Sequence, residues 1–446
     1  MHIIQGRVRD YTWGARDVIP EFFGLPAADT PVAELWLGAH AGAPARCGVG
    51  PHAVALAAED VRVDDAGPAA SAGGAGEAGA DVACPADVVS PADVVSPAGP
   101  AADLRDYIAR DPEGVLGRDV MRRHQGELPF LLKLIAPAQP LSLQVHPSME
   151  QAARGFVRES ERGIALDAPN RSYKDALHKP ELVYAFTRFE ALVGFRSPRR
   201  IIGVLEGLGT ELTDRLADLI RYEPNAGGVR EAFSCLLSAS RPSADAVAEV
   251  VEACRTRPAE DSPSPRADAI VGRLASFFPG DPGVVASLLL NPVTLNPGEA
   301  MFTPAGTVHA YLSGFGLEIM ANSDNVLRAG LTSKYVDVPE LLDVMETVAA
   351  PPIRIAPERI SPVQSTYYAP VDDFELSIVN LRDATRRVKL RGAGPRILLC
   401  VAGAAEIRTA SGQYCLMNTG QAAFVRADDG ILQARGAGRL VLAEVP

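Results

Sequence analysis

The stretch LNPGEAMFTPAGTVHAYLSG, residues 295–314, contains two short apolar runs that are separated by Pro304 and Gly306. Apolar runs of this length with turn residues between them are typical of paired β-strands. The same pattern recurs in AELWLGAH (33–40), LPFLLKLI (128–135), ELVYAF (181–186) and ALVGF (191–195). Together these stretches predict an all-β sandwich or barrel instead of alternating strand–helix units.

The stretch LSLQVHP, residues 141–147, places polar residues in an otherwise apolar run. If it is extended, its side chains alternate between two faces. The polar face then carries Ser142, Gln144 and His146, and the packing face carries Leu141, Leu143 and Val145. A Gln-x-His pair alone is typical of hydrogen-bonded side chains that line a cleft, so a metal site would need further ligands.

The composition of the chain excludes some classes of partner. Its 446 residues, 47% hydrophobic and 22% charged, are ordinary for a globular protein of two or three domains. The 43 Lys and Arg residues against 55 Asp and Glu give a net charge of −12. This balance argues against nucleic acid or an anionic membrane as the main partner, and an anionic substrate would need a local basic pocket.

The cysteines and apolar runs indicate a cytoplasmic protein. The six cysteines are scattered without a CxxC pair, so we expect reduced or buried thiols and no thiolate metal site. The first residues, MHIIQGRVRDYTWG, lack a basic region followed by an apolar core, and the run ILLCVAGAA (397–405) is too short to cross a bilayer.

Two segments of the chain lack this β pattern, and a third has the pattern but contains no histidine. Residues 63–101 are dominated by Ala, Gly, Pro and Asp and repeat PADVVS, which predicts a disordered surface insertion. Residues 198–290 have apolar positions at spacings of three and four, which predicts helices. From residue 356 the pattern returns to strands without any histidine, so histidine chemistry must lie in the first 310 residues.

We therefore divide the chain into four parts. These are residues 1–197 as the first part of a β domain, 198–290 as a helical domain, 291–355 as the second part of the β domain, and 356–446 as a separate C-terminal β-sandwich.

The spacing of Gly298, Pro304, Gly306 and His309 resembles the second motif of cupin-type jelly rolls. In those proteins a hairpin carries a histidine into the barrel mouth, which implies that His309 faces the same interior as His146. The motif departs from the cupin pattern at its end, since a serine stands at 313 where many cupins have asparagine.

Glu181 offers a carboxylate to these histidines. It follows Pro180 at the start of a predicted strand, a position where a surface glutamate is also common. With Gln144, His146 and His309 it completes a nitrogen and oxygen set, and two imidazoles with one carboxylate bind catalytic zinc or non-haem iron. A neutral amide as the fourth ligand leaves the metal more Lewis acidic than a second carboxylate would.

The segment NSDNVLRAGLTSK (322–334) carries Arg328 and Lys334 soon after the His309 hairpin. It is either a connecting loop with solvated cations or a segment that covers the same barrel mouth. In the second case the two cations can hold a phosphate group.

These motifs, taken in order, resemble the type I mannose-6-phosphate isomerases (phosphomannose isomerases) of the cupin superfamily. The matching stretches are YTWG (11–14), AELWLGAH, LPFLLKLIAPAQPLSLQVHP (128–147), HKPELVYAF (178–186) with LVGFR (192–196), LNPGEAMFTPAGTVHAYLSG and MANSDNVLRAGLTSKYVDVPEL (320–341). The resemblance covers residues 1–48 and 102–355 by motif, and the family pattern lacks the 63–101 segment. It implies a mainly β fold: a cupin-like jelly-roll catalytic domain with a helical insertion domain and a C-terminal β-sandwich.

The resemblance also implies a function. A family member is a cytoplasmic, monomeric zinc enzyme that interconverts mannose 6-phosphate and fructose 6-phosphate, in carbohydrate metabolism and GDP-mannose biosynthesis. One zinc ion per chain would be held by Gln144, His146, Glu181 and His309. Arg328 would act in catalysis, and the residues that grip the substrate, mostly its phosphate, would be Ser142, Lys133, Arg328 and Lys334.

The base of such an isomerase stays open. Aldose–ketose isomerisation moves a proton between C2 and C1 through a cis-enediol, and the candidates are Lys179, Glu318 and a zinc-bound water. Lys179 can face the site or solvent, whereas Glu318 lies in an apolar run, where an unpaired carboxylate is costly, so a functional or ion-paired role is favoured. The residues expected to wall the pocket are Trp13, Glu34, Trp36 and His40, although core packing fits the tryptophans equally well.

Two other classes of function are compatible with parts of the chain. A cupin dioxygenase would use His146, Glu181 and His309 as an iron-binding triad, but it would not require the Arg328 and Lys334 pair. A non-catalytic sugar-binding protein fits the histidine-free C-terminal segment only.

Overall fold

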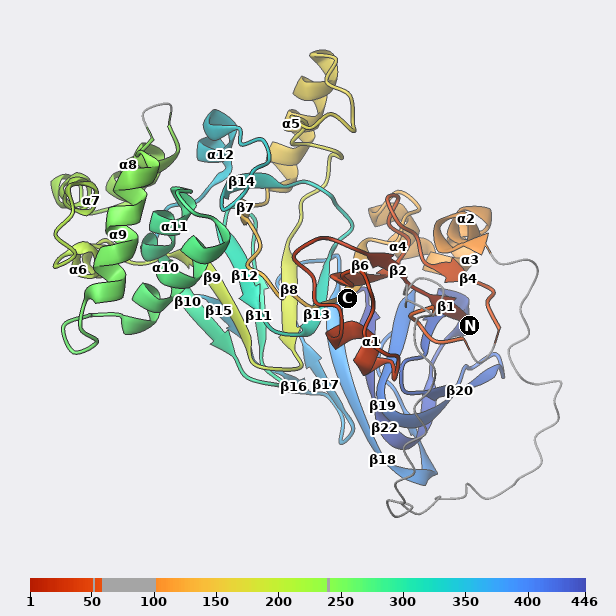
Figure 1. Cartoon of the computed structure of the whole chain (residues 1–446). Coiled ribbons are helices and arrows are strands. Elements are labelled where there is room, and N and C mark those ends of the chain that lie inside the picture. Colours follow the sequence, from red (N-terminus) through yellow and green to blue (C-terminus); the bar gives the residue numbers. More distant parts are fainter. Residues whose placement is uncertain (51–52, 58–101, 239–240) are drawn as a thin grey trace.

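The computed structural model of the protein describes residues 1–50, 53–57, 102–238 and 241–446 (Figure 1). Across these described residues the strands form three sheets, and all strand pairs in them are antiparallel. The predicted disordered insertion over 63–101 lies outside the described residues, so it stays a prediction.

A seven-stranded sheet and a five-stranded sheet carry the candidate polar residues identified in the sequence. The seven-stranded sheet runs in the order β15-β11-β8-β13-β6-β3-β2. Its strands are β2 (Arg7–Arg9), β3 (Glu34–Gly38), β6 (Phe130–Ile135), β8 (Glu181–Ala185), β11 (Ala300–Thr303), β13 (Gly316–Ala321) and β15 (Ile353–Ile355). The five-stranded sheet runs in the order β10-β9-β12-β7-β14. Its strands are β7 (Leu143–Val145), β9 (Phe189–Phe195), β10 (Leu290–Leu295), β12 (His309–Ser313) and β14 (Leu327–Gly330).

These two sheets pack face to face. One apolar cluster joins Ile135, Val183 and Met301 of the seven-stranded sheet to Val193 and Tyr311 of the five-stranded sheet. A sandwich with an apolar layer between two antiparallel sheets is the arrangement of a jelly roll. The mainly β, cupin-like fold predicted from the sequence is confirmed.

Alternation along the strands sends their polar residues into this sandwich. Leu143 and Val145 of β7 pack outward against helices, so Gln144 between them points inward. Likewise Leu182 of β8 packs away from the sandwich, which leaves Glu181 on its inner side. One assignment was wrong: Leu141 precedes β7 and packs against the inner cluster, because the regular strand begins only at Leu143.

Helices cover the outer face of the five-stranded sheet, as predicted for residues 198–290 (Figure 1). They are α6 (Pro198–Leu205), α7 (Glu211–Tyr222), α8 (Ala226–Leu237), α9 (Ala244–Thr256), α10 (Pro265–Phe277) and α11 (Gly283–Ala286). Their buried faces join one apolar cluster with Leu143, Ala310 and Leu327 of the sheet. This layer therefore holds the strands that carry the inward polar residues.

The third sheet packs on the other face of the seven-stranded sheet, through a cluster that includes Leu132, Ile319, Ile397 and Val441. Its strands are β1 (His2–Gln5), β4 (Arg46–Cys47), β5 (Ala102–Asp103), β16 (Glu358–Arg359), β17 (Gln364–Tyr367), β18 (Glu375–Lys389), β19 (Arg396–Arg408), β20 (Tyr414–Asn418), β21 (Ala422–Val425) and β22 (Gln433–Glu444). The N-terminal β1 pairs with β21, so the C-terminal sheet is not built from residues 356–446 alone. The four-part division remains a proposal about units that fold together.

The remaining helices lie at the edges of these layers. They are α1 (Val18–Phe22), α2 (Leu104–Arg110), α3 (Pro112–Leu116), α4 (Arg118–Arg123), α5 (Met149–Glu161) and α12 (Val338–Val344). In the part of the chain that the structure describes, no helix has the length and apolar character needed to cross a membrane. Cys47, Cys235, Cys254, Cys400 and Cys415 are buried free thiols, as predicted.

Candidate active site

A cleft of about 510 Å³ lies where the inner faces of the two jelly-roll sheets meet. The residues singled out in the sequence that line it are Lys133, Ser142, Gln144, Lys179, Glu181, Glu318, Arg328 and Lys334. His146 and His309 are both buried beside Glu181. The structure thus brings all the candidate residues to one place, although they come from six strands and the loops between them.

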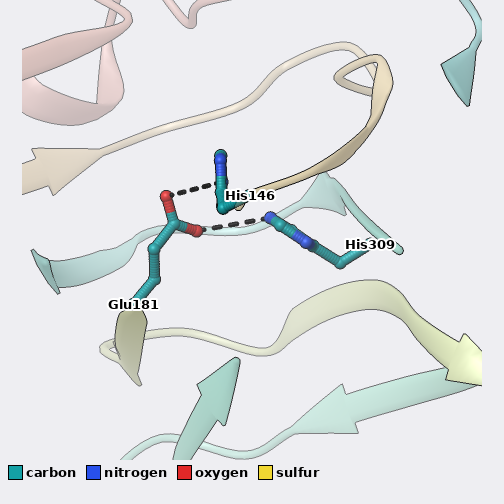
Figure 2. A group of neighbouring side chains, drawn as sticks. All are labelled: His146, Glu181 and His309. Carbon is teal, nitrogen blue, oxygen red and sulfur yellow. Dashed lines mark ion pairs between the residues drawn. The ribbon is translucent and has the colours of Figure 1, made fainter. Parts of the chain in front are cut away.

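His146, Glu181 and His309 form a compact cluster (Figure 2). Nε2 of His146 lies 3.2 Å from Oε1 of Glu181, and Nε2 of His309 lies 3.3 Å from Oε2 of the same carboxylate. The ligand atoms of all three residues lie within 4.8 Å of one another. This is a spacing that one metal ion can span.

Both imidazoles present a lone pair to this cluster. Nδ1 of His146 donates to the backbone carbonyl of Asn325 at 2.7 Å, and Nδ1 of His309 donates to that of Thr307 at 2.9 Å. In a neutral ring of this tautomer Nε2 carries the lone pair, and Nε2 of His146 has no hydrogen-bond partner in the described part of the chain. Burial lowers the pKa of His146 to about 4, so this ring is neutral at pH 7.

Gln144 completes the set. Gln144 of β7 is the strand partner of His309 of β12, and Nε2 of its amide lies 3.3 Å from Nε2 of His309. Two imidazoles, a carboxylate and an amide at one point fit a divalent ion that accepts nitrogen and oxygen ligands. The Nδ1 hydrogen bonds of the two histidines are of the kind that fixes the tautomer of metal-binding rings.

Glu181 is held in its charged form. Burial alone would raise its pKa, but the neighbouring His146 and Lys179 keep the pKa well below its ordinary value. Nζ of Lys179 lies 3.4 Å from Oε1 of Glu181, so this lysine faces the cleft and not the solvent. The hydroxyl of Tyr311 also donates to Glu181, at 3.4 Å.

A second buried ion pair lies on the strands β6 and β13 of the same sheet. Nζ of Lys133 lies 3.1 Å from Oε2 of Glu318, which bears out the ion-paired role favoured for this glutamate. Although burial opposes the charge of Lys133, the carboxylates of Glu34 and Glu318 raise its pKa above the ordinary value. Burial and the charge of Glu181 raise the pKa of Glu318.

Aromatic rings line the wall around this pair. Trp13, Glu34 and Trp36 line the cleft as expected, and the indole of Trp36 donates to Glu34 at 2.6 Å. The ammonium of Lys133 lies 5.0 Å from the centre of the Trp36 ring. His40 does not line the cleft; it packs edge-on behind Trp36.

The outer end of the cleft is cationic. Lys174, Arg328 and Lys334 all line it, and burial, followed by the charges of Arg328 and Lys174, lowers the pKa of Lys334. Burial also lowers the pKa of Arg328. No carboxylate within the described ranges forms an ion pair with any of the three, so their charge remains available to an anion.

Comparison with known proteins places the chain in a family. A family model described as the catalytic domain of phosphomannose isomerase type I matches residues 88–198. Mannose-6-phosphate isomerase from Escherichia coli (strain K12) is 35% identical over 435 residues, which span 97% of this chain and 96% of that protein. The chain belongs to the mannose-6-phosphate isomerase family. The resemblance seen in the sequence is confirmed.

Other members of the mannose-6-phosphate isomerase family agree with this placement. The mouse protein of that name is 32% identical over 350 residues, 74% of this chain and 79% of its own length. A zinc-bound crystal structure of a mannose 6-phosphate isomerase superposes with a TM-score of 0.80 at 34% identity, covering 100% of this chain and 99% of that one. A mutant phosphomannose isomerase from Salmonella typhimurium gives 0.80 at 33% identity over the same shares.

Some residues of this mannose-6-phosphate isomerase family site were missed in the sequence. Asn325 holds His146 through its backbone carbonyl, and Tyr311 contacts Glu181. Asp324 lines the cleft and pairs with His40 at 3.5 Å. Lys174 also lines the cleft, and its place five residues before Lys179 in KDALHKP was a usable signal, because both follow the same loop into the cleft.

Proposed function

We propose that this protein is a zinc-dependent isomerase that interconverts mannose 6-phosphate and fructose 6-phosphate through a cis-enediol. The observation that carries the proposal is the pairing, in one cleft, of the His146, Glu181 and His309 cluster with three cations that have no carboxylate partner among the described residues. The relatives of similar length are named mannose-6-phosphate isomerases, and a structural relative binds zinc. A dioxygenase would have no use for the cationic end.

The cations act on the phosphate. A sugar phosphate carries close to two negative charges at pH 7, and Arg328, Lys334 and Lys174 can donate to its oxygens. Ser142 lies in the same cleft and adds a neutral donor. Because the chain as a whole is acidic, with a net charge of −12, this local basic region selects the phosphate end of the substrate.

The inner end of the cleft carries the chemistry. When bound by Gln144, His146, Glu181 and His309, zinc supplies a Lewis acid that polarises a sugar oxygen. Arg328 stabilises negative charge that develops on oxygen during proton transfer, since its guanidinium stays cationic at neutral pH. Its position beside Gln144 across β14 and β7 suits this role.

Two side chains can move the proton between C2 and C1. Lys179 and Glu318 both reach the cleft, and the raised pKa of Glu318 brings it nearer to the working pH of a general base. Lys133 is not a candidate, because its raised pKa keeps it protonated. Measuring exchange of the C2 proton with D₂O in Glu318→Gln and Lys179→Met identifies the base, as the variant that loses exchange while still binding substrate.

One assay tests the proposed function. Fructose 6-phosphate formation from mannose 6-phosphate is measured in the purified protein, after chelation, and after zinc is added back. We expect activity that chelation removes and zinc restores. Absence of activity in protein that contains one zinc ion per chain would overturn the proposal.

We also propose that the enzyme is a cytoplasmic monomer. The five described cysteines are free and buried, which fits a reducing compartment. Light scattering after size-exclusion chromatography checks the mass against 47.1 kDa, and cell fractionation checks the location. A stable dimer or a membrane-associated fraction would contradict the respective statement.

A further inference from the structure

The segment that delivers Lys334 to the cleft has unusual backbone. It begins at the last residue of β14, Gly330, which has φ 132°, and continues with Leu331 at φ 52°. The backbone of the buried Leu331 lies in the left-handed region, which residues other than glycine rarely adopt. Such a conformation persists only where the surroundings enforce it.

One contact that holds this segment comes from the helical layer. The turn after α10 places Asp281 against the segment, and its Oδ2 accepts from the backbone N–H of Thr332 at 3.2 Å. Its other oxygen, Oδ1, accepts from the backbone N–H of Gly283 at 2.7 Å, which fixes the carboxylate itself. The hydroxyl of Thr332 then accepts from the backbone N–H of Lys334 at 3.1 Å. A chain of three hydrogen bonds thus links the helical layer to Lys334.

Close backbone packing brings the two segments together. A Cβ atom on Gly283 would lie 2.7 Å from the backbone nitrogen of Leu331, and one on Gly330 would lie 3.0 Å from Cα of Gly283. Glycine at both positions lets α11 and β14 touch, as their neighbouring positions in Figure 1 show. The Asp281 contact therefore lies where the helical layer packs closely against the five-stranded sheet.

Beyond Leu331, which packs in the core of the helical layer, residues 332–334 of the segment are less tightly packed. A second hollow of about 410 Å³ lies on the helical side of it, lined by Asp281, Pro282, Gly330, Thr332, Ser333 and Lys334 among others. Thr332, Ser333 and Lys334 also line the substrate cleft. Since Thr332, Ser333 and Lys334 have open space on both sides, the hydrogen bonds at Thr332 and Lys334 fix the position of this part of the segment.

We propose that Asp281 is a positioning residue for phosphate recognition: its carboxylate fixes the backbone at Thr332 and thereby sets where Lys334 stands in the cleft. The inference rests on the proposed role of the cationic end. Asp281 does not touch the reacting carbons, because it lies in the helical layer behind the segment. Its loss should weaken phosphate binding and leave the chemical step intact.

The test is a split between KM and kcat. In Asp281→Ala we expect KM for mannose 6-phosphate to rise about tenfold, as for a lost hydrogen bond to a charged group, with kcat within about twofold of wild type. The inhibition constant of inorganic phosphate should rise in parallel, whereas that of the neutral polyol mannitol should not change. Asp281→Asn offers one acceptor oxygen in place of two, so it should show a smaller rise in both phosphate-dependent constants.

The control and the contrary outcomes separate this inference from the proposed function. Asp245→Ala removes an exposed carboxylate from the same helical layer and should leave every constant unchanged. An active wild type with an unchanged KM in Asp281→Ala, or in Asp281→Asn should the alanine variant not fold, overturns the inference. A loss of kcat at constant KM overturns it as well. An inactive, zinc-loaded wild type would instead refute the proposed function.

Discussion

Two buried glutamates in different sheets show what makes a carboxylate functional. Glu181 begins β8 in the catalytic jelly roll, and Glu444 ends β22 in the C-terminal sheet. Each residue is only 1% exposed. Yet the pKa of Glu181 lies well below its ordinary value and that of Glu444 well above it. Burial is equal, so the neighbours cause the difference.

The neighbours of Glu444 oppose its charge. Burial raises its pKa first, and the carboxylate of Glu375 adds to this, while Arg396 offsets the two only in part. Neither carboxyl oxygen of Glu444 has a hydrogen-bond partner among the described groups. Glu181, in contrast, faces two imidazoles and Lys179. The surroundings of Glu444 therefore disfavour its charged form, whereas those of Glu181 favour it.

The strongest way to test this contrast is the same substitution at both sites. Glu181→Gln removes the anionic ligand from the cluster, and we expect turnover to fall at least about a hundredfold together with the bound zinc. Glu444→Gln should retain zinc and turnover. Elemental analysis of zinc and the isomerase assay measure both. Full activity in Glu181→Gln would break the contrast.

A second substitution separates the effect of a cation in the cleft on turnover from the effect of losing the metal. Arg328→Ala should lower kcat by about a hundredfold to a thousandfold, because it removes a cation from the region where oxygen charge develops. Bound zinc should stay near one per chain, since in the described part of the chain Arg328 forms no hydrogen bond or ion pair with either histidine. Arg382→Ala, an exposed arginine of the C-terminal sheet, is the matched control. Turnover at the wild-type level would refute the role of Arg328.

A smaller effect on zinc binding is expected from Asn325, whose backbone carbonyl accepts a hydrogen bond from His146. The side chain of Asn325 donates to the carbonyl of Leu177 at 2.8 Å and accepts from the N–H of Lys174 at 2.7 Å, and so holds the carbonyl that orients His146. Asn325→Ala should weaken zinc binding about tenfold to a hundredfold. Chelator competition measures this affinity.

The neighbouring Asn322 provides the control for that measurement. Its buried Oδ1 has no hydrogen-bond partner in the described part of the chain, so Asn322→Ala should change zinc affinity little. Equal losses in the two variants would show that the loop, and not the hydrogen bonds of Asn325, sets the affinity.

The sequence predicted what local patterns encode. Alternation in LSLQVHP placed Gln144 on the inner face, and the hairpin motif placed His309 beside it, because strand periodicity depends on neighbouring residues only. Contacts between segments that are distant in the sequence produce no local pattern, so the sequence did not predict them. The carbonyl of Asn325 that orients His146 and the pairing of β1 with β21 arise from tertiary packing. Leu141 was misassigned because the strand begins two residues later than its apolar pattern indicates.

The smallest expected effect concerns Glu444 itself. Its folded pKa lies above the unfolded value near 4.5, so the folded state binds the proton more tightly, and the stability that this gives is full below about pH 4.5 and falls as the pH rises through the folded pKa. Glu444→Gln keeps a neutral group at every pH. Its Tm should therefore exceed that of wild type by about 2 °C or more at pH 8, and the gap should shrink towards pH 5.

Glu406 in β19 is the matched control for this shift, because it has the opposite surroundings. Arg387 and Arg435 both pair with its carboxylate and, against the effect of burial, lower its pKa. A lowered folded pKa gives stability that is present above the unfolded value and lost in acid, so Glu406→Gln should reduce Tm at pH 8. Thermal unfolding of both variants at pH 5 and pH 8 measures the two signs. Shifts of the same sign at pH 8 would show that burial, and not the neighbouring charges, governs both carboxylates of this sheet.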